Sequence, residues 1–79
     1  MQLNRDEART VQRWRKSIGT NIHQARMRRK LVMAKFSKNT GMSQQILDLY
    51  ELGKGEIDLN QMVKIASALR IDVCQLLDK

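Results

Sequence analysis

Two adjacent glutamines, Gln44 and Gln45, stand where a helix should begin, directly after Ser43 in the stretch MSQQILDLYELGKG. Each glutamine side chain ends in an amide, which donates and accepts hydrogen bonds at the same time. Such an amide can bind a base edge in the major groove of DNA, where donors and acceptors stand side by side. It can equally be a solvated residue on a helix, since glutamine favours helices. The two residues alone leave both interpretations open.

No group of residues in the sequence suggests catalysis or metal binding. His23 is the only histidine and Cys74 is the only cysteine, which excludes a metal cluster built from either residue type. The sequence also lacks a glycine-rich phosphate loop and any recognisable pairing of a nucleophile with a base. We therefore expect a protein that is not an enzyme and has no cofactor.

The charge is distributed unevenly along the chain. Residues 1–38 contain eleven basic and two acidic residues, whereas residues 39–79 contain four basic and six acidic ones. A cationic half of this density exceeds what solubility requires and favours a polyanion such as nucleic acid as partner. A membrane surface suits it less, because the basic first helix has only one narrow apolar stripe. No apolar run approaches the ~20 residues of a membrane span either. We expect a cytoplasmic protein with no membrane segment.

The composition and the spacing of apolar residues predict a helical chain. Proline is absent and glycine is scarce, so few residues oppose helix formation. We predict helices over residues 5–16, from Gly19 or Thr20 to residue 30, over residues 33–39 and 44–52, a further helix from residue 59, and a last one from residue 73. The helix from residue 59 has apolar residues at helical spacing, which predicts a core face of Leu59, Met62, Ile65, Ala66 and Leu69.

The helices predicted at 33–39 and 44–52 flank a turn centred on Gly41, which is the pattern of a helix-turn-helix. From Ile18 to Leu77 the chain resembles the Cro/C1-type helix-turn-helix family of lambdoid phage repressors and xenobiotic-response-element-like regulators. The resemblance runs without a gap through Ile18, Gly19, Ile22, Arg26, Phe36, Gly41, Met42, Ser43, Leu47, Tyr50, Glu51, Gly53, Leu59, Met62, Ile65, Ala66, Leu69, Ile71, Asp72, Val73, Leu76 and Leu77.

The resemblance implies an all-α fold, a five-helix lambda-repressor-like DNA-binding bundle with an additional N-terminal helix. We expect residues 1–17 to form that basic extension and residues 18–79 to form the helix-turn-helix domain. Trp14, on the extension, is expected to pack on the domain, with a contact to a dimer partner or to DNA as the alternatives.

The resemblance also implies that helix 44–52 is the recognition helix. The residues expected to contact bases are Gln44, Gln45, Asp48 and Leu49. Contacts with phosphate are expected from Ser43, Lys54, Lys35, Lys38, Arg28, Arg29 and Lys30. Leu49 stands where related repressors often carry a polar residue, so it either touches a thymine methyl group or contacts a partner protein. Ile46 raises the same alternative.

Three structural features follow from the same resemblance. Arg26 and Glu51 are expected to form a partly buried salt bridge. A homodimer is expected to form through the last helix, at Ile71, Val73 and Leu76. Val32 replaces the usual serine or threonine cap, so the helix at 33–39 should begin poorly.

Two functions remain open at this level. The first is a sequence-specific regulator of transcription, a repressor that binds double-stranded DNA as a homodimer. The second is a protein-interaction module, such as an antitoxin or adaptor, that uses the same fold to hold a protein partner.

Overall fold

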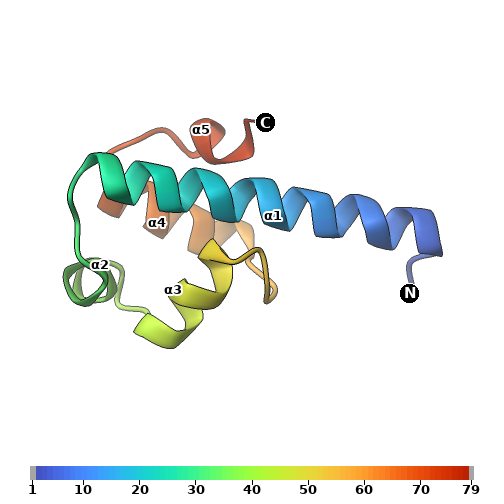
Figure 1. Ribbon diagram of the computed structural model, residues 1–79, viewed down its shortest axis with the longest axis horizontal. Helices are drawn as coiled ribbons and strands as arrows, with labels where there is room; N and C mark the ends of the chain where they lie inside the picture. Colours follow the sequence, from blue (N-terminus) through green and yellow to red (C-terminus); the bar gives the residue numbers. More distant parts are fainter. Residues whose placement is uncertain (1, 79) are drawn as a thin grey trace.

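The computed structural model describes residues 2–78, and all regular structure in that range is helical (Figure 1). The helices are α1 (Arg5–Arg28), α2 (Met33–Thr40), α3 (Gln44–Glu51), α4 (Leu59–Leu69) and α5 (Val73–Leu77). The prediction of an all-helical bundle is therefore confirmed. Residues 1 and 79, the outer limits of the two expected segments, lie outside the described range. None of the helices in residues 2–78 combines the length and the apolar character that a membrane span requires.

Short polar side chains determine where most of the helices begin. Asn4, Asp58 and Asp72 start α1, α4 and α5 with capping boxes, in which cap and third helical residue exchange side chain–backbone hydrogen bonds. These bonds satisfy N–H groups that have no partner within the helix. Val32 precedes α2 without a side-chain hydrogen bond, as the sequence predicts.

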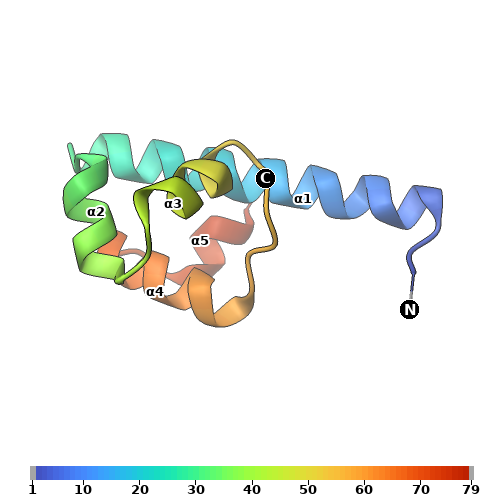
Figure 2. The same cartoon turned by 90° about the horizontal axis from the view of Figure 1, so that it is seen from below.

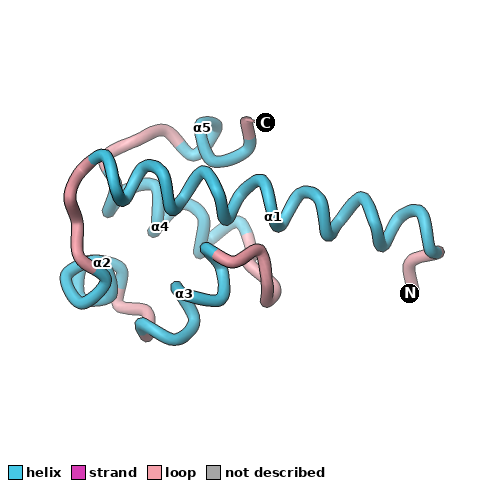
Figure 3. The backbone as a smooth tube through the Cα atoms, viewed as in Figure 1, coloured by secondary structure: helices cyan, strands magenta, loops and turns pink. Residues whose placement is uncertain are grey.

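The later turns of α1 form one side of the bundle, and its N-terminal turns project beyond the other helices (Figure 1, Figure 2). α3 and α5 lie on different sides of α1 and both contact it. The loop between α3 and α4, residues 52–58, lies beside the middle of α1 (Figure 3). Every helix contributes to the core, whose fully buried large side chains are Phe36, Ile22, Leu47, Ile65, Leu69 and Leu76.

The expected N-terminal helix is not a separate element. The segments predicted at 5–16 and 20–30 form one continuous helix of 24 residues, α1. No proline interrupts this stretch, and Gly19, which the prediction treated as a boundary, is helical and buried. A glycine costs an α-helix only about 1 kcal/mol, and tertiary packing around Gly19 offsets that cost.

Two leucines differ in burial from what the sequence predicts. Leu59 was expected in the core, but it is 61% exposed, because the first turn of α4 lies at the edge of the bundle. Leu76 was expected at a dimer interface, but it is fully buried between the helices of its own chain. α5 is only five residues long, so its attachment to the bundle depends on burying this side chain.

The crossing of α1 with the C-terminal end of α3 is too close for any side chain larger than that of glycine. A Cβ atom on Gly19 would lie 2.3 Å from the carbonyl oxygen of Tyr50 and 2.8 Å from that of Glu51. On the other side of the contact, a Cβ on Gly53 would lie 2.8 Å from Cα of Lys16. Backbone therefore packs directly on backbone at this point.

Replacing Gly19 with alanine tests this contact. Alanine favours helices over glycine by about 1 kcal/mol, but the clash with the α3 carbonyls should outweigh that gain. We expect Gly19→Ala to lower the free energy of unfolding by about 1–3 kcal/mol, measured by urea denaturation with circular dichroism.

Gly41→Ala serves as the control. A Cβ at Gly41 would meet no atom within 4 Å, and its φ of +72° predicts a loss of only about 1–2 kcal/mol from backbone conformation. A Gly19→Ala protein as stable as the wild type would contradict the close crossing.

Candidate nucleic-acid interface

The turn between α2 and α3 is held by its own side chains. Gly41 takes the left-handed conformation that ends α2. The Thr40 hydroxyl, which is buried, accepts a hydrogen bond from the Met42 backbone at 3.2 Å and donates to the carbonyl of Phe36. Ser43 then caps α3 by accepting from the backbone N–H of Ile46 at 3.1 Å. These contacts fix the direction in which α3 leaves the turn.

α3 has an inner face that is buried and an outer face that is exposed to solvent. Leu47 and Tyr50 are buried, whereas Gln44, Gln45 and Asp48 are exposed. Three predicted base-contacting side chains thus lie together on the outer surface. They border a hollow of about 400 Å³ that is also lined by Arg26 and by Met33, at the start of α2.

This surface offers a mixed set of hydrogen-bonding groups. Gln44 and Gln45 each carry a donor and an acceptor, and the Asp48 carboxylate only accepts. Such groups match base edges in the major groove, where an amide binds adenine and a carboxylate accepts from cytosine. Leu49, the fourth predicted residue, is 40% exposed and offers an apolar contact on a neighbouring side of α3.

The ion pair that the sequence predicts between Arg26 and Glu51 is present in the structure. The Arg26 guanidinium donates to both carboxylate oxygens, from Nε at 2.6 Å and from Nη2 at 3.0 Å. Its third donor, Nη1, binds the carbonyl of Leu31 at 3.0 Å. The side chains are only 13% and 6% exposed, so one guanidinium connects α1, the turn after α1 and the end of α3.

His23 also contacts the Glu51 carboxylate, which sequence analysis missed. Its Nδ1 lies 2.7 Å from Oε1, and a carboxylate only accepts, so Nδ1 carries the donated proton. The signal was present in the spacing, because residues three apart share a helix face and His23 stands three positions before Arg26. The predicted contact between Arg26 and Glu51 therefore placed His23 near the same carboxylate.

These contacts change the ionisation of the pair. Burial favours the neutral form of Glu51 and raises its pKa, but hydrogen bonds from Arg26 and His23 outweigh that effect. The pKa of Glu51 consequently lies below its ordinary value of 4.5. The hydrogen bond with Glu51 raises the pKa of the Arg26 guanidinium, against the opposing effect of burial. The carboxylate is therefore held in its charged form.

The cationic residues expected at phosphates do not all lie near the outer face of α3. All are exposed, and Lys35 and Lys38 stand on α2, which lies beside α3. Arg28 and Arg29 instead line a hollow with Leu69, Ile71 and Gln75, on the side of α1 that faces α4 and α5. Lys30, in the turn after α1, has a positive φ of 53°, a backbone conformation that favours glycine. Lys54 follows the C-terminal end of α3. Ser43, which was also expected to contact phosphate, is exposed at the start of α3.

The apolar residues that were expected to contact another protein molecule are partly buried within this chain. Ile71 and Val73, expected at a dimer interface, both pack against the core and keep only partial exposure. Ile46, considered as a contact for a protein partner, also packs against the core. The last helix therefore leaves little apolar surface free for another molecule.

Comparison with known proteins gives two findings. A family model described as helix-turn-helix matches residues 22–76. The crystal structure of the restriction-modification controller protein C.AhdI from Aeromonas hydrophila is similar, with a TM-score of 0.75 and 21% sequence identity. The match covers 78% of this chain and 94% of that one, and identity this low shows the likeness of fold alone. No curated protein sequence matches the chain.

Removing one partner of the buried ion pair should cost more than removing both. Arg26→Met leaves the Glu51 carboxylate buried without its main partner, and we expect a loss of about 3 kcal/mol or more in unfolding free energy. The double variant Arg26→Met with Glu51→Met removes both charges and should lose less than either single variant. Urea denaturation of all four proteins measures this difference, and additive losses would contradict it.

Stability should also fall in acid through Glu51. Because its pKa is lower in the folded than in the unfolded chain, the unfolded chain takes up the proton first as the pH falls. The stabilisation is complete above about pH 4.5 and is lost as the pH drops through the lower pKa of the folded state.

Unfolding free energies measured by urea denaturation between pH 6 and pH 3 would show this loss. Glu51→Gln should flatten the profile over the acid range. Glu56→Gln, at a carboxylate whose side chain is 90% exposed, should follow the wild-type profile. Equal slopes for Glu51→Gln and the wild type would refute the assignment.

Proposed function

Because the chain belongs to the Cro/C1-type helix-turn-helix family, we propose that it is a sequence-specific repressor of transcription that binds double-stranded DNA with α3 in the major groove. The family supports a DNA-binding regulator of transcription. Repression, the bases contacted and the assembly on DNA are the parts that we add. We expect the protein to act in the cytoplasm, where it would bind this DNA.

One observation carries the proposal. α3 is fixed at its C-terminal end by Gly19 and Arg26, while the N-terminal end presents Gln44 and Gln45 to solvent. A recognition helix binds bases with its N-terminal residues, and it must be held rigidly for those residues to discriminate between sequences. The fixed end and the free end of α3 meet both requirements.

Phosphate contacts would come from side chains that flank α3 in the chain. Lys35 and Lys38 on α2 and Lys54 after α3 are the cations that we assign to this role, with Ser43 at the start of α3. Such contacts position the protein on DNA without specifying sequence. Arg28 and Arg29 are assigned a weaker, long-range attraction because they line a hollow on the side of α1 that faces α4 and α5, and Lys30, which follows them in the turn, is assigned the same role.

A homodimer fits this function, since one recognition helix covers only half of an operator. Two subunits related by a two-fold axis would bind half-sites about 34 Å apart, one turn of the double helix. Repression then follows from occupancy of the operator.

An interaction module is the second candidate, and Leu49 is the observation that favours it. This leucine is 40% exposed on α3, where a base-contacting residue would be polar. A module of this kind would keep its partner when the glutamines are changed and lose it when Leu49 becomes charged.

Selection from a random pool of duplex DNA at near-physiological salt tests the proposal. We expect an enriched inverted repeat with half-sites one helical turn apart. Gln44→Ala and Gln45→Ala should each relax the preference at particular base pairs, with a loss of about 1–3 kcal/mol in binding there.

Gln24→Ala, at an exposed glutamine on α1, is the matched control and should retain the wild-type preference. Retention of DNA with no enriched sequence, declining steeply with salt, would show only electrostatic attraction and would refute a specific regulator.

A further inference from the structure

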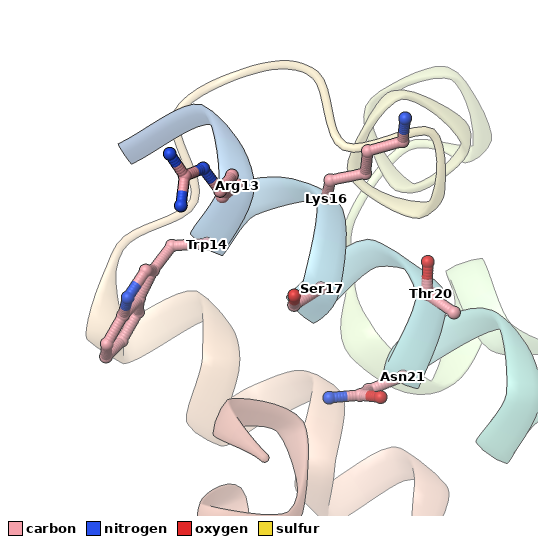
Figure 4. A pocket seen from close by; sticks show the side chains of 6 residues that line it. All are labelled: Arg13, Trp14, Lys16, Ser17, Thr20 and Asn21. Carbon is pink, nitrogen blue, oxygen red and sulfur yellow. The ribbon is translucent and has the colours of Figure 1, made fainter. Parts of the chain in front are cut away.

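Trp14 is a half-exposed indole that stands beside unfilled space. It is 49% exposed and borders one hollow with Arg13 and Lys16, and another with Ile18 and Leu77. Figure 4 shows Trp14 and Lys16 extending to opposite sides of α1, so the side chains of the first hollow do not converge on a small ligand. Burying an indole gives a large gain in free energy, so this surface is suited to contact with a larger molecule.

A third hollow continues this surface as an apolar groove. It has a volume of about 330 Å³ and lies between α1 and the start of α4. We call it the Trp14 groove and define it by Val11, Trp14, Ile57 and Met62, with Leu77 at one end. None of these five side chains is fully buried, so the groove can receive apolar atoms from outside.

The shape of the Trp14 groove suits a helix. Val11, Trp14 and Ile18 follow α1 at spacings of three and four residues, and the buried Ile18 forms the floor. From Val11 to Ile18 the groove extends over about 10 Å of helix. A docked amphipathic helix presents apolar side chains at i, i+3, i+4 and i+7 over the same length and satisfies its own backbone hydrogen bonds. An extended peptide would need a free strand edge, and residues 2–78 contain no strand.

The charged residues that line the Trp14 groove and the first hollow are all cationic. Arg15 lines the groove, and Arg13 and Lys16 line the hollow. No carboxylate lines either one. An occupant with carboxylates beside its apolar side chains would therefore meet opposite charge at this surface.

The carboxylates on the adjoining segments already have partners within this chain. Glu56 lies 4.0 Å from Arg15, whose guanidinium has five donors and so can bind another carboxylate as well. Glu7 and Asp58 accept hydrogen bonds from backbone N–H groups in the capping boxes of α1 and α4. These acidic side chains therefore do not give the groove an acidic lining.

Charge and apolar surface together select one kind of occupant. Residues 5–16 of α1 extend beyond the bundle (Figure 2) with Arg5, Arg9 and Arg13 exposed, so the same segment of a second copy would bring like charge to Arg13 and Arg15. Duplex DNA has the opposite charge, but its outer surface is phosphate and would leave an apolar groove unfilled. A protein helix that carries acidic residues beside apolar ones meets both requirements.

We propose that the Trp14 groove binds an acidic amphipathic helix of a partner protein. The apolar side chains of that helix pack on Trp14 and Met62, and its carboxylates bind the guanidinium groups of Arg13 and Arg15. The groove faces α4 and α5, whereas the outer face of α3 borders Arg26, which lies about 18 Å further along α1 than Trp14. The partner and DNA can therefore be bound at the same time. This inference goes beyond the proposed function and does not depend on it.

Two synthetic helical peptides without tryptophan test the proposal. Both are about 18 residues long and carry leucine at the same i, i+3, i+4 and i+7 positions, but the polar positions hold glutamate in one and lysine in the other. Trp14 is the only tryptophan in the sequence, so its fluorescence reports directly on the groove. We expect the emission maximum to move to shorter wavelength, with saturation, as the glutamate peptide is added, and to stay in place with the lysine peptide.

Three results of this titration would overturn the proposal. An equal shift with both peptides would show that charge does not select the occupant. No shift with the glutamate peptide would show that the groove does not hold such a helix. A shift on dilution of the protein alone, with the midpoint at which sedimentation equilibrium shows a dimer dissociating, would assign the groove to a second copy.

Val11→Asp should weaken binding of the glutamate peptide about tenfold or more, because it places a carboxylate in the apolar groove. Val11 lies outside the core cluster, so circular dichroism should show an unchanged fold. Val32→Asp, at an exposed valine in the turn before α2, makes the same change at the other end of α1 and should bind the peptide as the wild type does.

Reversing one charge should exchange the preference between the peptides. Arg13→Glu should weaken binding of the glutamate peptide and allow the lysine peptide to bind, because the charge beside Trp14 is reversed. Lys64→Glu, at an exposed lysine on α4, makes the same change in net charge and should retain the wild-type preference. If both variants have the same effect, the peptides respond only to net charge and the proposal is wrong.

The DNA selection separates this proposal from the proposed function. Val11→Asp should retain the wild-type preference for DNA sequence, because the groove and the outer face of α3 are separate surfaces. A changed preference, or a shift of Trp14 emission when duplex DNA is added without peptide, would assign the groove to DNA and overturn the proposal. If no DNA sequence is enriched while the glutamate peptide still binds, the proposed function is refuted and the docking site stands.

Discussion

The crossing of α1 over the C-terminal end of α3 is the contact on which the rest of the structure depends. At Gly19 the two backbones meet with no room for a Cβ atom. Close to this contact, the Glu51 carboxylate accepts hydrogen bonds from Arg26 and His23. The steric contact sets the distance between the helices, and the ion pair sets their rotation. A buried carboxylate tolerates few arrangements, since each lost hydrogen bond leaves a charge without compensation. The orientation of α3 is therefore specified within narrow limits.

This constraint also explains why the two ends of α3 differ. The C-terminal end is buried under α1, and Tyr50, in its last turn, donates to Gln61 of α4 at 2.8 Å. The N-terminal end follows the short turn after α2, where Ser43 caps the helix. Polar side chains at this end keep their donors and acceptors free. The same sequence thus stabilises one end of α3 with the bundle and leaves the other available to a ligand.

Much of the fold and the outer face of α3 could be predicted because local signals and tertiary packing agree there. Capping residues, Gly41 and helical spacing locate α2 to α5 within a few residues of their observed bounds. Predictions were wrong where tertiary packing overrides a local signal. Gly19 suggested a helix boundary but packs inside α1, and Leu76 suggested a free apolar surface but fills the core. Leu59 shows the reverse, since helical spacing cannot tell that the first turn of α4 lies at the edge of the bundle.

The sequence by itself determined the helical class, the cationic N-terminal half and the pairing of Arg26 with Glu51, because residue type, spacing and family resemblance carry that information. Tertiary structure alone decided which side each residue faces. It separated Arg28 and Arg29 from the outer face of α3, brought His23 to Glu51, and left Trp14 beside an open groove. The physical reason is that exposure and proximity depend on how helices cross. That crossing arises from contacts between residues far apart in the chain, such as Gly19 with Tyr50, which no local pattern records.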